Sequence, residues 1–253
     1  MSLLVTHREW TPPLTAAGAA EAAGVPAIAA LTNPGRVGAT CEDGAMFDLP
    51  RDHPQASDRG MLVAVADGRG GPVPGEMASS LVLETIRRHY YRDTASKPGE
   101  ALELAARAAE AAVFQLARDT GGSRPAGVGF AALAIAGPDA YAVRTGNCRV
   151  YLIREGRVHR MNGHRSLRDI LLCRSQLMSL ARPAPLLPHD RLLLCTAGLF
   201  DHASEEEMAR VTAEHEPGAA CRILTEAVRR RGGRGDIAAA IVRIPPLREK
   251  VPE

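Results

Sequence analysis

The sequence predicts an α+β fold in which two antiparallel β-sheets pack face to face and helix pairs flank them. Short apolar runs of strand length occur near the start of the chain and again between residues 128 and 161. Two long segments with helical periodicity separate these groups, and two shorter helical segments precede a final strand. Consecutive strands joined by short turns pair antiparallel, so this order favours two stacked sheets with helices outside.

The strands are indicated by apolar runs that end at turn residues. Glu155 and Gly156 separate two of these runs and predict a hairpin turn. The run RLLLCTAG is expected to be a buried strand that ends in glycine, as Leu62–Gly68 does. The predicted strands are 27–31, 44–50, 60–67, 128–137, 139–146, 149–156, 157–161, 191–198 and 236–244.

Four helices are predicted between or after these strands. Apolar residues recur at helical spacing over 75–90 and 98–119, and Pro98 suits a first helical turn. Ser204 and Glu207 form a capping box that predicts a short helix. The segment 217–233 begins with proline, carries arginines in its last turn and ends in glycine, which predicts the fourth helix.

Length and composition set the broad class. The chain has 253 residues and a net charge of +2, which is too small to favour nucleic acid or a membrane surface. Its five cysteines include no C-x-x-C pair, which argues against a disulfide framework or a zinc site. No apolar stretch approaches membrane-spanning length, so a cytoplasmic protein is expected. We expect a loosely held segment over 1–25, one domain over 26–246 and a tail over 247–253.

Two glycine-rich stretches raise the question of nucleotide or RNA binding. A dinucleotide-binding loop after Asp67 requires glycine where the chain has Val73, and the lysine of a P-loop is absent. The tract RRRGGRGD is better explained as a cationic helix end followed by a turn. No nucleic-acid partner is therefore expected.

Five short motifs occur in a characteristic order. They are CED at 41–43, VADGRGG followed by GEMAS at 65–79, TGNCRVY at 145–151, HDRLLLCTAGLFD at 189–201 and GDIAAAIV at 235–242. In this order they resemble the metal-dependent Ser/Thr protein phosphatases of type 2C, the PPM family. The resemblance spans roughly residues 27–244 and implies a β-sandwich flanked by helix pairs.

The resemblance also implies a site chemistry. In this family, carboxylates at strand ends hold two Mg²⁺ or Mn²⁺ ions, and a metal-bridging water attacks a phosphoserine or phosphothreonine. It implies that Asp67 bridges the metals, that Gly68 lends its carbonyl, and that Glu42 and Asp43 bind through water or support the ligands. The missing side chain at Gly68 is expected to leave room for the ions.

Several positions depart from the family pattern. Ala197 and Gly235 stand where the family has metal-binding aspartates, and Asn147 stands where it has a further one. Gly163 replaces an aspartate that precedes histidine, and Gly38 replaces the arginine that binds substrate phosphate, with Arg36 two residues away. These losses nearly empty one metal site, so at most one weakly bound Mg²⁺ or Mn²⁺ ion is expected.

Neighbouring residues offer few replacements. Asp236 lies one residue from a lost ligand, but a one-residue shift in a strand turns the side chain to the opposite face. His164 and His202 are expected to be surface or supporting residues. An alternative for Glu42, Asp43 and Asp67 is that they only shape turns. The segment 167–180 is expected to form one amphipathic helix.

Three functions follow from these features. The first is a catalytically impaired phosphatase-like protein, a pseudophosphatase, that acts in regulation by binding a protein partner, with a phosphoprotein as one candidate. The second is an active Mg²⁺- or Mn²⁺-dependent phosphoserine/phosphothreonine phosphatase with altered ligands. The third is a structural or assembly subunit that uses the scaffold alone.

Overall fold

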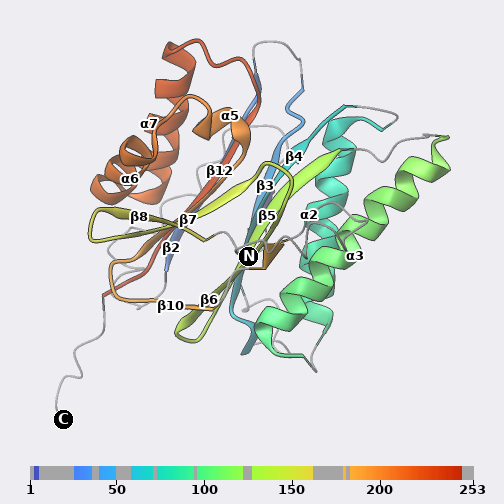
Figure 1. Cartoon of the computed structure of the whole chain (residues 1–253), viewed down its shortest axis with the longest axis horizontal. Coiled ribbons are helices and arrows are strands. Elements are labelled where there is room, and N and C mark those ends of the chain that lie inside the picture. Colours follow the sequence, from blue (N-terminus) through green and yellow to red (C-terminus); the bar gives the residue numbers. More distant parts are fainter. Residues whose placement is uncertain are drawn as a thin grey trace, which may run out of the picture.

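Two antiparallel sheets stack between two layers of helices, and the fold class predicted from the sequence is confirmed (Figure 1). The computed structural model describes residues 3–5, 26–35, 40–49, 58–70, 73–93, 96–121, 127–161, 179–180 and 183–246. In Figure 1, α2 and α3 cover one side of the sandwich, and α5, α6 and α7 cover the other.

The first sheet has seven strands in the order β1-β3-β4-β5-β6-β10, and β9 also pairs with β6. All of its pairings are antiparallel. Its strands are β1 (Leu3–Val5), β3 (Gly44–Asp48), β4 (Met61–Gly68), β5 (Val128–Ala136), β6 (Asp139–Thr145), β9 (Ser179–Leu180) and β10 (Ala184–Pro185).

The second sheet has five antiparallel strands in the order β2-β12-β11-β7-β8. The predicted hairpin joins β7 to β8, where Glu155 and Gly156 both adopt positive φ. Its strands are β2 (Ala27–Asn33), β7 (Arg149–Arg154), β8 (Arg157–Arg160), β11 (Arg191–Cys195) and β12 (Ile237–Arg243).

The helices form two separate layers. On the first sheet lie α2 (Gly75–Arg92) and α3 (Pro98–Asp119), with Pro98 in the first turn of α3. On the second sheet lie α5 (Ala197–Phe200), α6 (Glu205–Glu214) and α7 (Pro217–Arg230). The predicted cap at the start of α6 forms, because the Ser204 side chain accepts the backbone N–H of Glu207.

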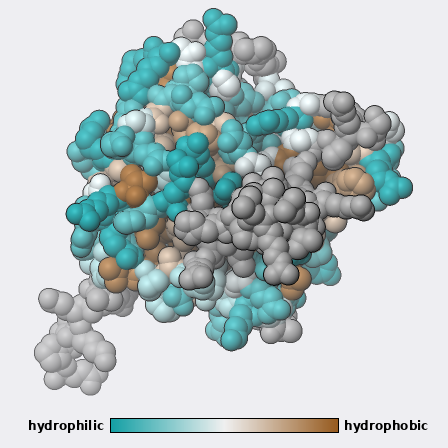
Figure 2. Space-filling view, viewed as in Figure 1, coloured by the Kyte–Doolittle hydropathy of each residue, from teal (hydrophilic) through white to brown (hydrophobic). Residues whose placement is uncertain are grey.

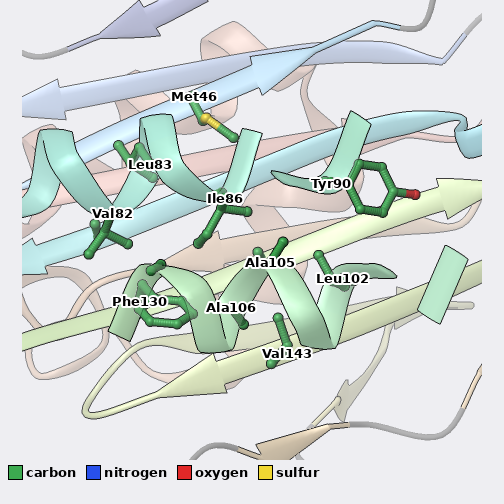
Figure 3. Close-up of a cluster of buried hydrophobic side chains, with 14 of the residues drawn as sticks. Met46, Val82, Leu83, Ile86, Tyr90, Leu102, Ala105, Ala106, Phe130 and Val143 are labelled. Atoms are coloured by element: carbon green, nitrogen blue, oxygen red, sulfur yellow. The ribbon is translucent and has the colours of Figure 1, made fainter. Parts of the chain in front are cut away.

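Three apolar layers hold the sandwich together. In β4, Leu62, Ala64 and Ala66 pack against α2 and α3, and the alternate residues Val63 and Val65 pack between the two sheets. Successive strand side chains point to opposite faces, so β4 is buried on both. Figure 3 shows the helix side of this arrangement, where side chains of α2 and α3 lie over those of the first sheet. The third layer lies between the second sheet and α5–α7.

Three expectations from the sequence are wrong in part. The segment 1–25 is not loosely held throughout, because Leu3–Val5 pairs with β3 as an edge strand. The amphipathic helix expected over 167–180 does not reach its end, because Ser179–Leu180 pairs with β6, and residues 167–178 lie outside the described ranges. The strand expected over 191–198 ends at Cys195, and a helix begins at Ala197.

Four cysteines lie within the described residues, at positions 41, 148, 195 and 221. All four are free and buried. Burial raises the pKa of the Cys41 and Cys221 thiols to about 12, and raises those of Cys148 and Cys195 as well. These thiols are therefore protonated at neutral pH.

The surface is mainly polar in the described parts of the face shown in Figure 2, with small separate apolar patches. Within the described ranges, no helix has the length and apolar character that crossing a bilayer requires.

Candidate functional site

One end of the sandwich gathers acidic residues from several strands. Asp67 is the second-to-last residue of β4. Glu42 and Asp43 directly precede β3, whose Gly44 pairs with Ala66 of β4. Asp236 directly precedes β12. Antiparallel pairing places the end of β4 beside the start of β3, and the hydrogen bond from the Glu42 N–H to Asp236 brings the start of β12 to the same end. Asp67 and Glu42 thus lie at the same end, where the sequence placed them.

Asp67 is half-buried and electrostatically crowded. Burial raises its pKa, and the negative charges of Asp236, Glu42 and Asp201 raise it further. Arg69 opposes this effect from 3.8 Å, but its side chain is 62% exposed, so solvent weakens the ion pair. The Asp67 carboxylate is therefore poorly compensated by the protein's own positive charges.

Asp43 is buried and has one strong hydrogen-bond partner. The Thr196 hydroxyl donates to Asp43 Oδ2 at 2.7 Å and accepts the backbone N–H of Ala238 at 2.9 Å. Burial is the main cause that raises the pKa of Asp43 to about 8, and the charge of Asp67 adds to it. Asp43 thus links the start of β3 to the end of β11 and the start of β12, and favours its protonated form at neutral pH.

Asp236 reaches the site, which corrects the expectation that its side chain faces away. Its Oδ1 accepts the backbone N–H of Gly35 at 2.5 Å, and its Oδ2 accepts that of Glu42 at 2.6 Å. Its charge also raises the pKa of both Asp43 and Asp67. The inward direction matches the alternation of β12, where Ala238 and Ala240 pack between the sheets. The carboxylate is used to hold the loop between β2 and β3.

Glycines let the Glu42 segment approach the end of β4. A Cβ at Gly75 would lie 2.7 Å from Glu42 Cδ, and a Cβ at Gly70 would lie 3.3 Å from Glu42 Oε1. A Cβ at Gly68 would lie 2.2 Å from the carbonyl oxygen of Gly75 and 2.5 Å from that of Glu42. The missing side chain at Gly68 therefore makes room for the neighbouring backbone.

The positions that depart from the phosphatase pattern lie at this end where they are described. Ala197 is the first residue of α5, directly after Thr196. Gly235 is exposed, and a Cβ added there would meet nothing within 4 Å. Asn147 is exposed in the turn between β6 and β7. Gly38 and Gly163, like Arg36 and His164, lie outside the described residues.

Two supporting groups were missed by the sequence analysis. Asp201 follows α5 and contributes negative charge to Asp67, and Thr196 satisfies Asp43. Both lie in the run CTAGLFD beside Ala197, so the motif itself was the available signal. His202 is exposed and lies beside Gly233, away from any contact with these carboxylates that the described residues show.

The acidic end does not fit a two-metal centre. Among the described residues, no three His, Cys, Asp or Glu side chains are arranged to hold a metal ion. Two carboxylates are already engaged, that of Asp43 by a hydroxyl and that of Asp236 by two backbone N–H groups. A pair of divalent ions requires several free oxygen ligands, which Ala197 and Gly235 do not supply.

Comparison with known proteins settles the relationship. Residues 57–245, more than half of the chain, match the protein family described as Stage II sporulation protein E (SpoIIE). The chain belongs to the SpoIIE family. No curated protein matches the chain.

Solved phosphatases share the fold of this SpoIIE-family chain. PppA, described as a key regulatory component of T6SS in Pseudomonas aeruginosa, is 28% identical with a TM-score of 0.70, over 86% of this chain and 97% of that one. The serine/threonine phosphatase PstP/Ppp of Mycobacterium tuberculosis is 24% identical with a TM-score of 0.71, over 87% and 99%. The PstP catalytic domain, solved in complex with two manganese ions, is 23% identical with a TM-score of 0.70, over 87% and 98%. The recognition as a PPM-type phosphatase fold is therefore confirmed.

Proposed function

We propose that this SpoIIE-family chain is a pseudophosphatase, a regulatory module that binds a protein partner through a phosphatase scaffold whose metal centre is degenerate. The main observation in support is that the Asp236 carboxylate is engaged in hydrogen bonds within the protein. Its carboxylate is the nearest replacement for the ligand missing at Gly235, and it holds the backbone N–H groups of Gly35 and Glu42. A carboxylate committed to two such bonds is a poor ligand for a second ion.

The state of Asp43 supports the same proposal. The Asp43 side chain is buried, and its Oδ2 already accepts the Thr196 hydroxyl, so part of its capacity as a ligand is used within the protein. Affinity for a hard divalent ion depends on the number of charged ligands. We infer at most one weak Mg²⁺ or Mn²⁺ ion beside Asp67, Gly68 and Glu42, and little or no phosphatase turnover.

A regulatory role is supported by the similarity to PppA, which is described as a key regulatory component of T6SS. On this proposal the chain acts in the cytoplasm on a protein partner, with a phosphoprotein as the leading candidate. An assembly subunit that never binds an ion or a phosphate would share the fold but not the response to restored ligands described next.

The test is to restore the missing ligands. Wild type, Ala197→Asp/Gly235→Asp and the uncharged control Ala197→Asn/Gly235→Asn are assayed with an aryl phosphate and a phosphoserine peptide in Mn²⁺. An added side chain at Gly235 has open space, and an aspartate at the start of α5 suits the helix dipole. We expect measurable Mn²⁺ binding, with a gain in turnover, in the aspartate variant alone.

The active-phosphatase alternative is favoured by the crowded charge at Asp67, which Glu42, Asp201 and Asp236 share. It predicts a different result from the same experiment. Robust Mn²⁺-dependent turnover by wild type, abolished in Asp67→Ala, would replace the proposal with an enzyme that uses altered ligands.

A further inference from the structure

A second site lies away from the acidic end, between β2 and α7. A pocket of about 310 Å³ opens there on the outer face of the second sheet. Leu31 and Asn33 of β2 line it, together with Arg222, Thr225, Arg229 and Arg230 of α7. The pocket is thus formed by one apolar side chain, two neutral polar side chains and three guanidinium groups, with Glu226 as the one acidic residue in its lining.

The positive charge of this pocket exceeds its negative charge. Glu226 lies 3.7 Å from Arg230, and both side chains are about two-thirds exposed, so solvent screens this pair. Arg222 is exposed, and the described residues show no ion pair for it. An arginine fork matches the oxygens of phosphate or carboxylate groups.

Arg229 is held in place by the loops beside the pocket. Its guanidinium donates to Asn33 Oδ1 at 2.7 Å, to the Pro34 carbonyl at 3.0 Å and to the Gly235 carbonyl at 2.8 Å. These bonds hold the guanidinium in a fixed position beside the pocket, which lowers the cost of ordering on ligand binding.

Thr225 gives independent reason to expect a ligand. It is only 5% exposed, it lines the pocket, and its hydroxyl has no hydrogen-bond partner among the described residues. An unsatisfied buried hydroxyl costs free energy, so such groups call for an explanation. A hydroxyl can donate one hydrogen bond to a ligand oxygen.

We propose that this pocket binds a phosphate oxyanion, with Arg222 and Arg230 supplying charge-assisted hydrogen bonds and the buried, unpartnered Thr225 hydroxyl as a further donor beside them. The oxyanion comes either from free inorganic phosphate or from a phosphorylated side chain of a protein. This site shares no side chain with the acidic end, so it stands or fails independently of the proposed pseudophosphatase function.

Calorimetric titration of the full chain tests the proposal. The probes are inorganic phosphate, a phosphoserine peptide and the same peptide without phosphate. Wild type is compared with Arg222→Gln and Thr225→Val, and with the control Arg88→Gln, which removes an exposed arginine of α2 on the other side of the sandwich. Asp67→Asn tests whether the acidic end contributes to phosphate binding.

We expect Arg222→Gln to weaken phosphate binding by about 10-fold, because it removes a bond between two charged groups. Thr225→Val should weaken binding several-fold and yet stabilise the free protein, because it removes the unsatisfied hydroxyl. Arg88→Gln and Asp67→Asn should leave the affinity unchanged. Preference for the phosphopeptide over inorganic phosphate identifies a protein source, and equal affinity identifies free phosphate.

The proposal is overturned if wild type shows no binding at about 10 mM phosphate, far above the dissociation constants of specific sites. It is also overturned if Arg222→Gln and Thr225→Val bind as wild type does. Loss of binding in Asp67→Asn, with both pocket variants unaffected, would move phosphate recognition to the acidic end.

Discussion

The Asp236 Oδ2 atom accepts the backbone N–H of Glu42 at 2.6 Å, across the gap between the two sheets. With the second bond to Gly35, one carboxylate fixes both ends of the loop that joins β2 to β3. Asp236, which directly follows Gly235, thus acts as a structural clamp on this loop.

Replacement of this clamp should destabilise the protein. Asp236→Ala removes a charged acceptor from two backbone N–H groups and is expected to lower the free energy of unfolding by about 3 kcal/mol. Asp236→Asn should cost less, because its amide oxygen still accepts one of the two bonds. Urea unfolding followed by circular dichroism measures the change, with Asp201→Ala as an exposed control at the same end. Equal stabilities of Asp236→Ala and wild type would mean that the clamp contributes nothing.

Stability should fall as the pH rises through the range set by Asp43. Its pKa is about 8 in the folded protein and 3.8 in the reference state, so the folded state binds the extra proton between these values. The free energy of unfolding therefore decreases with rising pH, by at most about 1.4 kcal/mol per pH unit. Urea unfolding between pH 5 and 8 in the presence of a chelator measures this slope.

Asp43→Asn is the matched variant for the pH experiment, because it keeps an acceptor for the Thr196 hydroxyl and cannot ionise. We expect its stability to be nearly independent of pH over this range. A wild-type profile as flat as that of Asp43→Asn would show that Asp43 does not hold the proton.

Asp67→Asn separates three roles for the residue at the end of β4. In chelator it should raise the melting temperature, because it removes one of several like charges that no cation balances. In about 1 mM Mn²⁺ a weak ion should raise the melting temperature of wild type slightly and leave that of the variant unchanged. Equal melting temperatures of both proteins in both conditions would leave Asp67 as a turn residue.

Gly75→Ala should disrupt the packing of Glu42. The new Cβ would lie 2.7 Å from Glu42 Cδ and 2.9 Å from Glu42 Cβ, so the loop before β3 must shift. We expect a loss of about 2 kcal/mol, within the range for overpacking. Gly218→Ala is the control, since its Cβ comes no closer than 3.7 Å to any atom beyond the adjacent backbone of its own helix, and alanine favours the helix. Thermal unfolding of Gly75→Ala/Glu42→Gly should show partial recovery, and no recovery would place the strain elsewhere.

The sequence predicts the fold better than it predicts the site. Helix α3 spans 98–119 as its periodicity and Pro98 indicate, because local signals determine both the pattern and the start. The β11 strand was predicted to continue to Gly198, but the chain turns into α5 after Thr196. A Cβ at Gly198 would lie 1.9 Å from the Asp236 carbonyl, so that glycine marks a close contact between α5 and the segment before β12.

The orientation of the Asp236 side chain could not be predicted from the residues next to it in the sequence. The face of β12 that points between the sheets continues through Ala240, Ala238 and Asp236, so position 236 and not position 235 faces the site. The hydrogen bonds that orient Asp236 come from Gly35 and Glu42, which lie 201 and 194 residues earlier in the chain. Only the pairing of β2 with β12 brings these segments together.

The buried thiols give the protein an internal set of unfolding reporters. An alkylating reagent attacks the thiolate, and burial keeps the described cysteines protonated and covered. Cys195 and Cys221 both lie in the apolar layer between the second sheet and α5–α7, and Cys148 lies in the layer between the two sheets, so the cysteines report on two different layers. The order in which they become modified by a pulse of reagent would trace which layer of the sandwich separates first, without any introduced label.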